Sequence, residues 1–295
     1  MPLTAGTICA PLIDLVRGMA KTEASDLHLV AGSKPMYRVH GRLVVAHDRA
    51  LDSGDVQSLL EAIAPPTTKA RLTDGVDLDF AATIDEGRSP HRVRVNVFTG
   101  RGEIGACIRA IPQRVPPIDE LSFPQELADR IVELNSGLVL ITGVTGSGKT
   151  TTLAALIQML NARGGHRIIT IEQPIEYVFE SAGQSIVTQR EVGVDVPSFH
   201  DGLRSGLRQD PDVLLVGEIR DRETAQLAIS AAETGHLIFA TLHTADAKGA
   251  ITRLVDIGIE PFLLTATVQG ILAQRLVRRV CRDCKNFYEP ADDVL

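Results

Sequence analysis

The chain of 295 residues has little of several features that would each indicate a class of protein. It contains no tryptophan, only 4% of its residues are aromatic, and its formal net charge at pH 7 is -7. A nucleic-acid translocase needs a basic channel or an aromatic stacking platform. The low aromatic content and the negative net charge therefore do not favour a nucleic-acid partner. The 44% of apolar and 23% of charged residues are instead typical of a globular protein, and the length fits two domains.

Long hydrophobic runs and a signal sequence are also missing. No apolar run approaches the ~20 residues that a membrane-spanning helix needs. The first twenty residues lack both a basic segment and a cleavage site. The cysteines are too few and too scattered for a disulfide framework; they are Cys9, Cys107, Cys281 and Cys284. We therefore expect a cytoplasmic protein in a reducing compartment.

Residues 1–111 have the pattern of a small α+β domain. Residues 10–20 predict a helix, and Ser53 is expected to cap a second helix that runs through Ala64 and is ended by Pro65 and Pro66. Alternating apolar and polar residues predict strands in SDLHLV, MYRVHGRLVV, VDLDFAATI, HRVRVNVFTG and EIGACIRAI. Successive strands joined by short turns favour an antiparallel sheet.

A proline-rich linker, residues 112–124, separates this domain from residues 125–295, where strands and helices alternate. The strand-like segments are GLVLITG, HRIITIE, DVLLVGE and HLIFATLH, and a helical pattern follows each strand. Continuous apolar strands between amphipathic helices predict an α/β fold with a mostly parallel sheet covered on both faces. Ligands of such sheets bind outside the carboxyl ends of the strands.

The segment GVTGSGKT, residues 143–150, matches the P-loop pattern G-x-x-x-x-G-K-[ST] between a predicted strand and a predicted helix. Its glycines let backbone N–H groups face the phosphates of ATP, Lys149 reaches the β and γ oxygens, and Thr150 ligates Mg²⁺. The alternative is a chance glycine turn before a helix. The predicted nucleotide-binding residues are Gly143, Val144, Thr145, Gly146, Ser147, Gly148, Lys149, Thr150 and Thr151.

Two acids at predicted strand ends are candidates for catalysis. Glu218 follows DVLLVG and is the candidate Walker-B acid, which would hold Mg²⁺ through water; Asp212 lies at the other end of that strand, ~20 Å away. Glu172 ends RIITIE and is the candidate base that activates water. Pro174 turns the chain so that Glu176 can also face the nucleotide. Solvated strand ends, or a pair between Glu176 and an arginine, are the alternatives.

Two histidines flank the strand HLIFATLH. His243 falls on the ligand edge and is a candidate sensor of the γ-phosphate. His236 is also included among the candidate nucleotide-site residues, although its place at the start of the strand fits a neighbouring subunit or domain as well. A buried histidine is more often a structural hydrogen-bonding residue, which is the alternative for both.

Four segments in order, GVTGSGKTTT, IEQPIEY, LRSGLRQDPDVLLVGEIRD and ETGHLIFATLHT, resemble the nucleotide motifs of the type II/type IV secretion ATPase superfamily. The resemblance covers about residues 20–290. It implies a RecA-like P-loop NTPase core preceded by a PAS-like domain, with the nucleotide between them. It further implies a homohexameric motor that hydrolyses ATP to drive pilus or pseudopilus assembly or retraction, or type II secretion. The implied partner is a polytopic inner-membrane platform protein, which would place the motor at the inner face of that membrane.

The resemblance also implies roles for arginines of the first domain. RVRVNVFTGRGEIGACIRAIP resembles the family segment whose arginines reach over the nucleotide, where a guanidinium would stabilise charge that develops on the γ-phosphate. The alternative is a basic strand face paired with acids such as Asp77 and Asp79. The candidates are Arg92, Arg94, Arg101 and Arg109.

The two ends of the chain resemble different branches of the family. ASDLHLVAGSKPMYRVHGRL resembles the retraction ATPases, whereas AITRLVDIGIEPFLLTATVQGILAQRLVRRVCRDCK resembles the assembly and secretion ATPases, so the direction of force stays open. In the second branch the similar C-x-x-C begins a four-cysteine zinc site. Only Cys281 and Cys284 precede the end at Leu295, so these two candidate zinc ligands belong either to a fragment of a longer chain or to a vestigial site.

Two other functions compete with the motor. A nucleic-acid translocase on a RecA-like core would show DNA-stimulated ATP turnover. A nucleotide-gated regulatory subunit would bind nucleotide without hydrolysing it, and Gln173 gives this alternative some support. The family usually has aspartate at that position, so this chain keeps the shape of the site and has one charge fewer.

Overall fold

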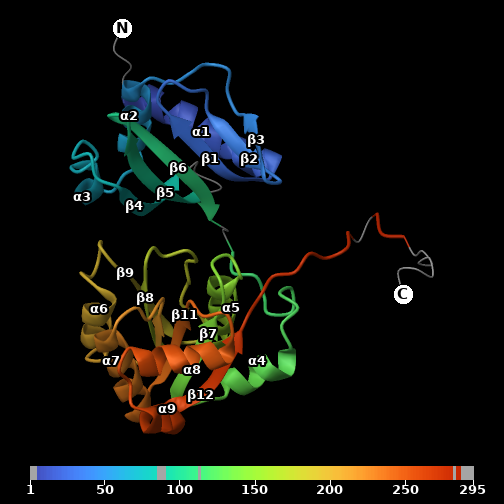
Figure 1. The fold of residues 1–295 in the computed structure, drawn as a ribbon, viewed down its shortest axis with the longest axis vertical. Coiled ribbons are helices and arrows are strands. Elements are labelled where there is room, and N and C mark those ends of the chain that lie inside the picture. The colour runs from blue at the N-terminus through green and yellow to red at the C-terminus, as the bar shows by residue number, and fades with distance from the viewer. Residues whose placement is uncertain (1–4, 85–90, 112–113, 282–283, 287–295) are drawn as a thin grey trace.

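The computed structural model describes residues 5–84, 91–111, 114–281 and 284–286, which form two lobes one above the other (Figure 1). In the described part of the chain each lobe contains a sheet of six strands, antiparallel in the first lobe and parallel in the second. The predicted α/β core with a preceding α+β unit is confirmed.

The first lobe has the strand order β3-β2-β1-β6-β5-β4, and helices cover one face. Its strands are β1 (Ala24–Val30), β2 (Met36–Val39), β3 (Arg42–Val45), β4 (Leu78–Ile84), β5 (His91–Gly100) and β6 (Glu103–Ile111). Its helices are α1 (Ala5–Thr22), α2 (Ser53–Glu61) and α3 (Pro66–Lys69).

The two faces of this sheet differ because its side chains alternate. Leu27, Val95 and Ile108 point into an apolar core with α1 and α2, and each is fully buried. The residues between them point to the opposite face, where Asp26 and Arg94 both flank Arg109 in the register of the strands. A charged surface therefore lies opposite the core.

The start of α2 differs from the prediction by one residue. Asp52, not Ser53, is the N-cap: its side chain accepts a hydrogen bond from the backbone N–H of Asp55 at 2.7 Å, and the Asp55 side chain accepts one from the Asp52 N–H at 3.1 Å. This reciprocal pair is a capping box, which satisfies two helix-end donors where a serine cap would satisfy one. The helix also ends at Glu61, before Pro65.

The second lobe has the strand order β12-β7-β11-β10-β8-β9. Its strands are β7 (Gly137–Thr142), β8 (Arg167–Glu172), β9 (Ile186–Glu191), β10 (Val213–Val216), β11 (Leu237–Leu242) and β12 (Val268–Ala273). Its helices are α4 (Gln125–Val132), α5 (Lys149–Arg163), α6 (Phe199–Gly206), α7 (Arg222–Glu233), α8 (Ala247–Asp256) and α9 (Pro261–Thr267).

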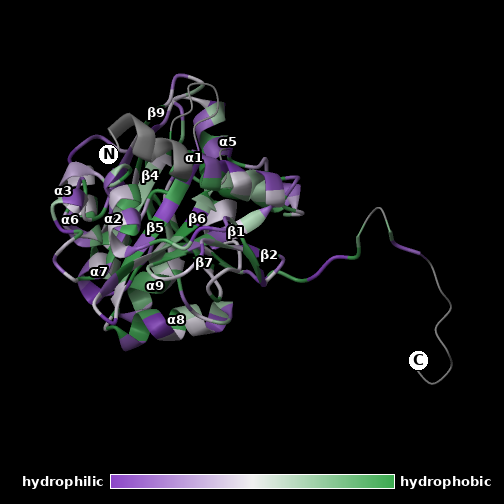
Figure 2. Cartoon of the chain, turned by 90° about the horizontal axis from the view of Figure 1, so that it is seen from above, coloured by the Kyte–Doolittle hydropathy of each residue, from purple (hydrophilic) through white to green (hydrophobic). Residues whose placement is uncertain are grey.

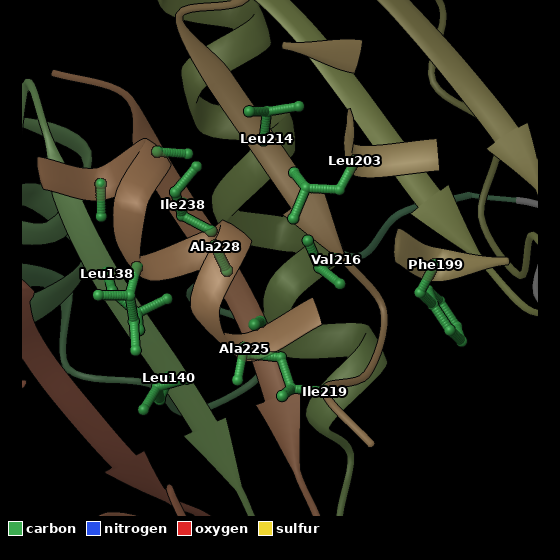
Figure 3. Packing of buried hydrophobic residues seen from close by; sticks show 14 of the residues in the cluster. Leu138, Leu140, Phe199, Leu203, Leu214, Val216, Ile219, Ala225, Ala228 and Ile238 are labelled. Atoms are coloured by element: carbon green, nitrogen blue, oxygen red, sulfur yellow. The ribbon is translucent and has the colours of Figure 1, made fainter. Parts of the chain in front are cut away.

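The central strands of the second lobe are buried on both faces, as the continuous apolar runs predict. Leu138, Leu214 and Ile238 face one core with α6 and α7 (Figure 3), whereas Val139 and Phe239 face a second core with α4 and α5. The predicted strands β7, β8, β10 and β11 are the four inner ones. The outer strands β9 and β12 were not predicted, because they are only partly buried and lack continuous apolar runs.

Beyond Gln274 the chain continues as an extended segment, residues 275–281, which runs outward from the second lobe (Figures 1 and 2). Its apolar residues face solvent: Leu276, Val277 and Val280 are 70%, 80% and 75% exposed. Elsewhere the hydrophobic residues are concentrated along the strands (Figure 2). None of the described helices combines the length and the apolar character needed to cross a bilayer.

Candidate active site

A cleft of about 540 Å³ lies at the carboxyl ends of the parallel strands. Both lobes line it, the second lobe with the P-loop and the ends of β8, β10 and β11, and the first lobe with one end of β5 and β6. The site residues that the structure brings together there are Thr145, Gly146, Ser147, Gly148, Lys149, Thr150, Thr151, Glu172, Glu176, Glu218, His243, Arg94 and Arg109. This is the ligand edge that the strand pattern predicted.

The P-loop connects β7 to α5, and its glycines adopt conformations that other residues rarely take. Gly143, Gly146 and Gly148 have φ values of 153°, 78° and 86°. The backbone therefore curls around the amino end of α5, where N–H groups without helical partners and the positive end of the helix dipole can meet an anion.

Lys149 is nearly buried inside this loop, with 8% of its surface exposed. Its Nζ donates hydrogen bonds to the carbonyl oxygens of Gly143 at 2.8 Å and Val144 at 3.1 Å. Burial lowers the pKa of the Lys149 ammonium, and the charge of Glu218 opposes that shift. The lysine is thus a buried cation held by weakly basic carbonyls, which phosphate oxygens would replace favourably.

The donors and acceptors around the loop fit a magnesium–nucleotide. The Oγ of Ser147 is buried and has no hydrogen-bond partner among the described residues. Thr150 and Glu218 line the cleft with side-chain oxygens of the kind that Mg²⁺ prefers. Within the described ranges no cluster of three or more histidine, cysteine, aspartate or glutamate residues could hold a metal ion. Mg²⁺ here would take most of its ligands from the nucleotide and water, and Cys281 and Cys284 form no zinc site with a third such residue of that part.

Glu172 ends β8 and is a buried carboxylate, 6% exposed. Its Oε1 accepts hydrogen bonds from the Thr170 hydroxyl at 2.7 Å and from the Gln189 amide at 3.1 Å. Burial raises the pKa of Glu172, and these two hydrogen bonds offset part of the increase. A carboxylate with a raised pKa is a stronger base, which suits the predicted removal of a proton from water.

Glu218 lies two residues beyond β10, and both of its oxygens are engaged. Oε1 is 3.2 Å from the His243 Nε2, and Oε2 accepts a hydrogen bond from the Arg220 Nε at 2.7 Å. Arg220 also donates to the Gln173 side chain at 3.4 Å and lies over the ring of Phe199, 5.8 Å from its centre. The ends of β8, β10 and β11 are therefore joined by one polar network.

Asp212 lies where the sequence predicted, at the opposite end of β10. Its side chain accepts a hydrogen bond from the backbone N–H of Arg167 at 2.7 Å. Arg167 begins β8, so this contact joins the amino ends of two strands. Glu218 is the acid of this segment that reaches the cleft.

Two of the four candidate arginines reach the cleft. Arg94 pairs with Asp79, with Nε 3.1 Å from Oδ1, and its Nη1 is 4.0 Å from the Glu176 carboxylate in the other lobe. Arg109 pairs with Asp26 at 2.8 Å, and its side chain is 65% exposed. The Arg94–Asp79 pair is partly exposed, so a nucleotide phosphate can compete for the Arg94 guanidinium at modest cost. Asp26 is buried, so Arg109 can contact a phosphate at low cost only if it keeps its contact with Asp26.

The other two candidate arginines, Arg92 and Arg101, do not line the cleft. Arg92 Nη2 donates to the backbone carbonyl of Ile175 at 3.0 Å, and its Nη1 is buried without a hydrogen-bond partner in the described part of the chain. Arg92 therefore holds the loop that follows Glu172 and does not line the cleft. Arg101 occupies the turn between β5 and β6, at the end of the hairpin away from the cleft. Within this chain the structure does not bring Arg101 to the nucleotide, contrary to the prediction.

His236 is a second correction. It precedes β11 at the amino end of the sheet, and its Nδ1 is 3.0 Å from the carbonyl oxygen of Ala231. The P-loop lies at the other end of the same sheet, so His236 does not join the cleft of its own chain. His243, at the carboxyl end, does.

Three residues that contact predicted site residues were not predicted: Arg220 bonds to Glu218, Gln189 to Glu172 and Gln274 to Ser147. Arg220 stands two positions after Glu218 in GEIRD. A basic residue so close to a candidate acid is a signal that the sequence alone could have given. Gln189 and Gln274 gave no such signal, because Gln189 lies in the unpredicted strand β9 and Gln274 follows the unpredicted strand β12. Neutral amides in edge strands are ordinary surface residues unless the tertiary contacts are known.

A P-loop at the carboxyl edge of a parallel sheet, with acids at the ends of two further strands, defines a P-loop ATPase with a RecA-like core. Residues 5–294 match the family model described as Type II/IV secretion system protein, so the chain belongs to this family.

Two proteins of Pseudomonas aeruginosa are similar to the chain. The type IV pilus retraction ATPase PilT is 41% identical over 275 residues, covering 91% of this chain and 78% of PilT. A type II secretion system protein E is 41% identical over 303 residues, covering 95% of this chain but 57% of the relative. Percentage identity alone therefore does not separate the two branches.

Among solved structures, one of the pilus retraction motor PilT with bound ADP has a TM-score of 0.83 and 40% identity. It covers 90% of this chain and 78% of that one. The ATPase DotB of Legionella pneumophila has a TM-score of 0.74 and 31% identity, and covers 89% of this chain and 75% of that one. The two-lobed arrangement is thus shared with known members of the family.

Proposed function

We propose that the chain is one subunit of a homohexameric motor that hydrolyses Mg²⁺-ATP and uses the energy to move its two lobes in pilus or pseudopilus assembly or retraction, or in type II secretion. The observation that carries this proposal is the cleft shared by the lobes. The second lobe contributes the P-loop, Glu172 and Glu218, and the first contributes Arg94 and Arg109. A nucleotide bound there would contact both lobes, so hydrolysis would change the contacts between them.

The geometry supports a division of labour during hydrolysis. The P-loop N–H groups and Lys149 hold the phosphates. Glu172 accepts a proton from the attacking water, whose oxygen bonds to the γ-phosphorus while the bond to the bridging oxygen breaks, giving ADP and phosphate. Bound Mg²⁺ would neutralise phosphate charge, and Thr150 and, through water, Glu218 would hold it.

The first lobe would respond to the charge on the γ-phosphate. Arg94 is shared between Asp79 and the Glu176 carboxylate, so it can move toward a phosphate without leaving an unpaired buried charge. His243 and Arg220 hold Glu218 on the other side and would respond to loss of the γ-phosphate. Arg92 ties β5 to the loop after Glu172 and would transmit the change to the first lobe.

The proposed setting is the cytoplasm, at the inner face of the inner membrane, with a polytopic membrane platform protein as the partner that receives the motion. The names of the relatives, a pilus retraction ATPase and a type II secretion protein, support this setting. The bound ADP of the PilT structure supports nucleotide binding by this fold. No nucleic acid is proposed as a partner, because the chain is acidic overall.

The test is ATP turnover of the purified chain with Mg²⁺, measured over a range of protein concentrations beside its oligomeric state. We expect little activity in the monomer and a rise in specific activity as hexamers form. Lys149→Ala should lose nucleotide binding, and removal of Mg²⁺ should stop turnover. Equal specific activity at all concentrations, with a monomer in the presence of ATP, would refute the ring. DNA-stimulated turnover would support a translocase instead.

A further inference from the structure

Gln274 directly follows β12 and contacts the P-loop with both halves of its side-chain amide. Its Nε2 donates a hydrogen bond to the backbone carbonyl of Ser147 at 2.9 Å, and its Oε1 accepts one from the Thr152 hydroxyl at 2.8 Å. Its backbone N–H donates to the carbonyl of Thr142 at 2.8 Å. The residue is therefore fixed at three points, to the strand before the loop, to the loop and to the helix after it.

The loop and Gln274 also approach each other closely. A Cβ added to Gly143 would lie too close to the Gln274 carbonyl oxygen, and a Cβ added to Gly148 would lie 2.8 Å from the Gln274 Nε2. Both distances are shorter than real Cβ contacts, so two glycines of the P-loop leave room for this one side chain and its backbone. Gly146, in contrast, has nothing within 4 Å of an added Cβ.

The hydrogen bond to Ser147 sets the orientation of one peptide group. A peptide is planar and trans, so its C=O and N–H point in opposite directions. Because Gln274 holds the Ser147 carbonyl on its own side, the N–H of Gly148 in the same peptide points away from Gln274, and Gly148 itself lines the cleft. Glycine at this junction makes a flip of the peptide cheap, and a flipped carbonyl would repel phosphate oxygens.

We propose that Gln274 is a positioning residue of the nucleotide site, which holds the 147–148 peptide with its N–H directed at the phosphates. The proposal deepens the proposed function and rests on nucleotide binding at this P-loop. It adds a contribution from β12, which lies at the edge of the sheet and carries none of the four nucleotide motifs.

The test compares the same substitution, glutamine to glutamate, at one position directly after β12 and at one position within β12. Gln274→Glu keeps the size of the side chain but replaces the donor with an oxygen that faces the Ser147 carbonyl. Gln269→Glu makes the same change at an exposed position in β12. Affinity for Mg²⁺-ATP and for ADP is measured with fluorescent analogues on the full chain, and the melting temperature is measured with and without nucleotide.

We expect Gln274→Glu to weaken both nucleotides about tenfold or more, since a hydrogen bond becomes a repulsive contact. Its nucleotide-induced rise in melting temperature should shrink, whereas Gln269→Glu should match the wild type in every measurement. In steady-state turnover the KM for ATP should rise more than kcat falls, because the peptide contacts the phosphates before as well as during hydrolysis.

A second pair of variants covers the case in which Gln274→Glu does not fold. Thr152→Val keeps the shape of the side chain and removes the hydroxyl that orients the Gln274 amide, so a smaller loss of affinity is expected. Thr152→Ser keeps the hydroxyl and should restore binding. A contact that serves only folding would change the melting temperature without nucleotide and leave the affinity intact.

The outcomes separate the two proposals. If the wild type binds nucleotide and Lys149→Ala does not, but Gln274→Glu and Thr152→Val keep wild-type affinity, the positioning role is wrong and the proposed function stands. If the wild type binds no nucleotide, both are wrong.

Discussion

The His243 Nε2 lies 3.2 Å from the Oε1 of Glu218, across the gap between the carboxyl ends of β11 and β10. These strands are neighbours in the parallel sheet, so two residues 25 positions apart in sequence meet at the ligand edge. The contact joins the candidate magnesium-binding acid to the candidate sensor of the γ-phosphate. Four predictions follow from this edge and the lobe above it.

Glu218→Gln should lower kcat for ATP hydrolysis about 100-fold or more and leave ATP affinity nearly unchanged. The amide keeps the size of the side chain but loses the charge that would hold the water shell of Mg²⁺. Phosphate release and equilibrium binding measure the two effects. Glu233→Gln, at the exposed end of α7, is the matched control and should behave as the wild type. Retained turnover in Glu218→Gln would remove this residue from the catalytic assignment.

Glu172→Gln should abolish most turnover but make the protein more stable at neutral pH. Burial raises the pKa of Glu172 in the folded chain above its value in the unfolded chain. As the pH rises above the ordinary glutamate value, the unfolded chain loses this proton first, so wild-type stability falls until the folded-state pKa is passed. The neutral variant lacks this loss.

The measurement is the melting temperature of wild type and Glu172→Gln across pH. The variant should melt at a higher temperature above the folded-state pKa of Glu172, and the difference should shrink as the pH falls to the ordinary glutamate value. The same raised pKa predicts that wild-type kcat falls on the acid side. A constant difference in melting temperature at every pH would contradict the titration of Glu172.

Arg94→Ala and Arg109→Ala should each lower kcat about tenfold or more, whereas Arg101→Ala should not. The first two line the cleft and the third occupies the distant turn of the same hairpin. A guanidinium that stabilises charge in the transition state affects kcat more than nucleotide affinity. Hexamer formation must be measured beside turnover for all three, since an equal loss in Arg101→Ala with intact hexamers would place the active arginine elsewhere.

Gln173→Asp should tune turnover by a few-fold without abolishing it. Gln173 accepts a hydrogen bond from Arg220 at 3.4 Å, so an aspartate would compete with Glu218 for this arginine. Pairs of this kind are partly exposed and contribute little each, which limits the effect. Gln173→Asn is the neutral control. Unchanged ATP affinity and unchanged turnover in Gln173→Asp would show that the charge at this position is irrelevant.

Much of the second lobe could be predicted from the sequence because its inner strands carry continuous apolar runs and its P-loop is a local motif. The strand ends that bear Glu172 and Glu218 then follow from the parallel topology, and the structure places both at the cleft. The outer strands β9 and β12 could not be predicted in this way, because half-buried edge strands have a weaker pattern.

The arginines show the limit of local pattern most clearly. Arg92, Arg94, Arg101 and Arg109 lie in one hairpin and look equivalent in the sequence. The register of β5 with β6 places Arg94 opposite Arg109 near the cleft and leaves Arg101 at the far turn. Strand direction and register decide which of them can meet a nucleotide.

The sequence by itself determined the P-loop, the candidate acids and the division into an antiparallel and a parallel sheet, because each depends on a short pattern of glycine, charge and hydrophobicity. Only the tertiary structure decided that His236 is far from the cleft of its own chain and that Gln274 holds the P-loop. Gln274 is 122 residues from its partner Thr152, and contacts over such distances arise from strand order in the folded sheet. Local preferences carry no information about them.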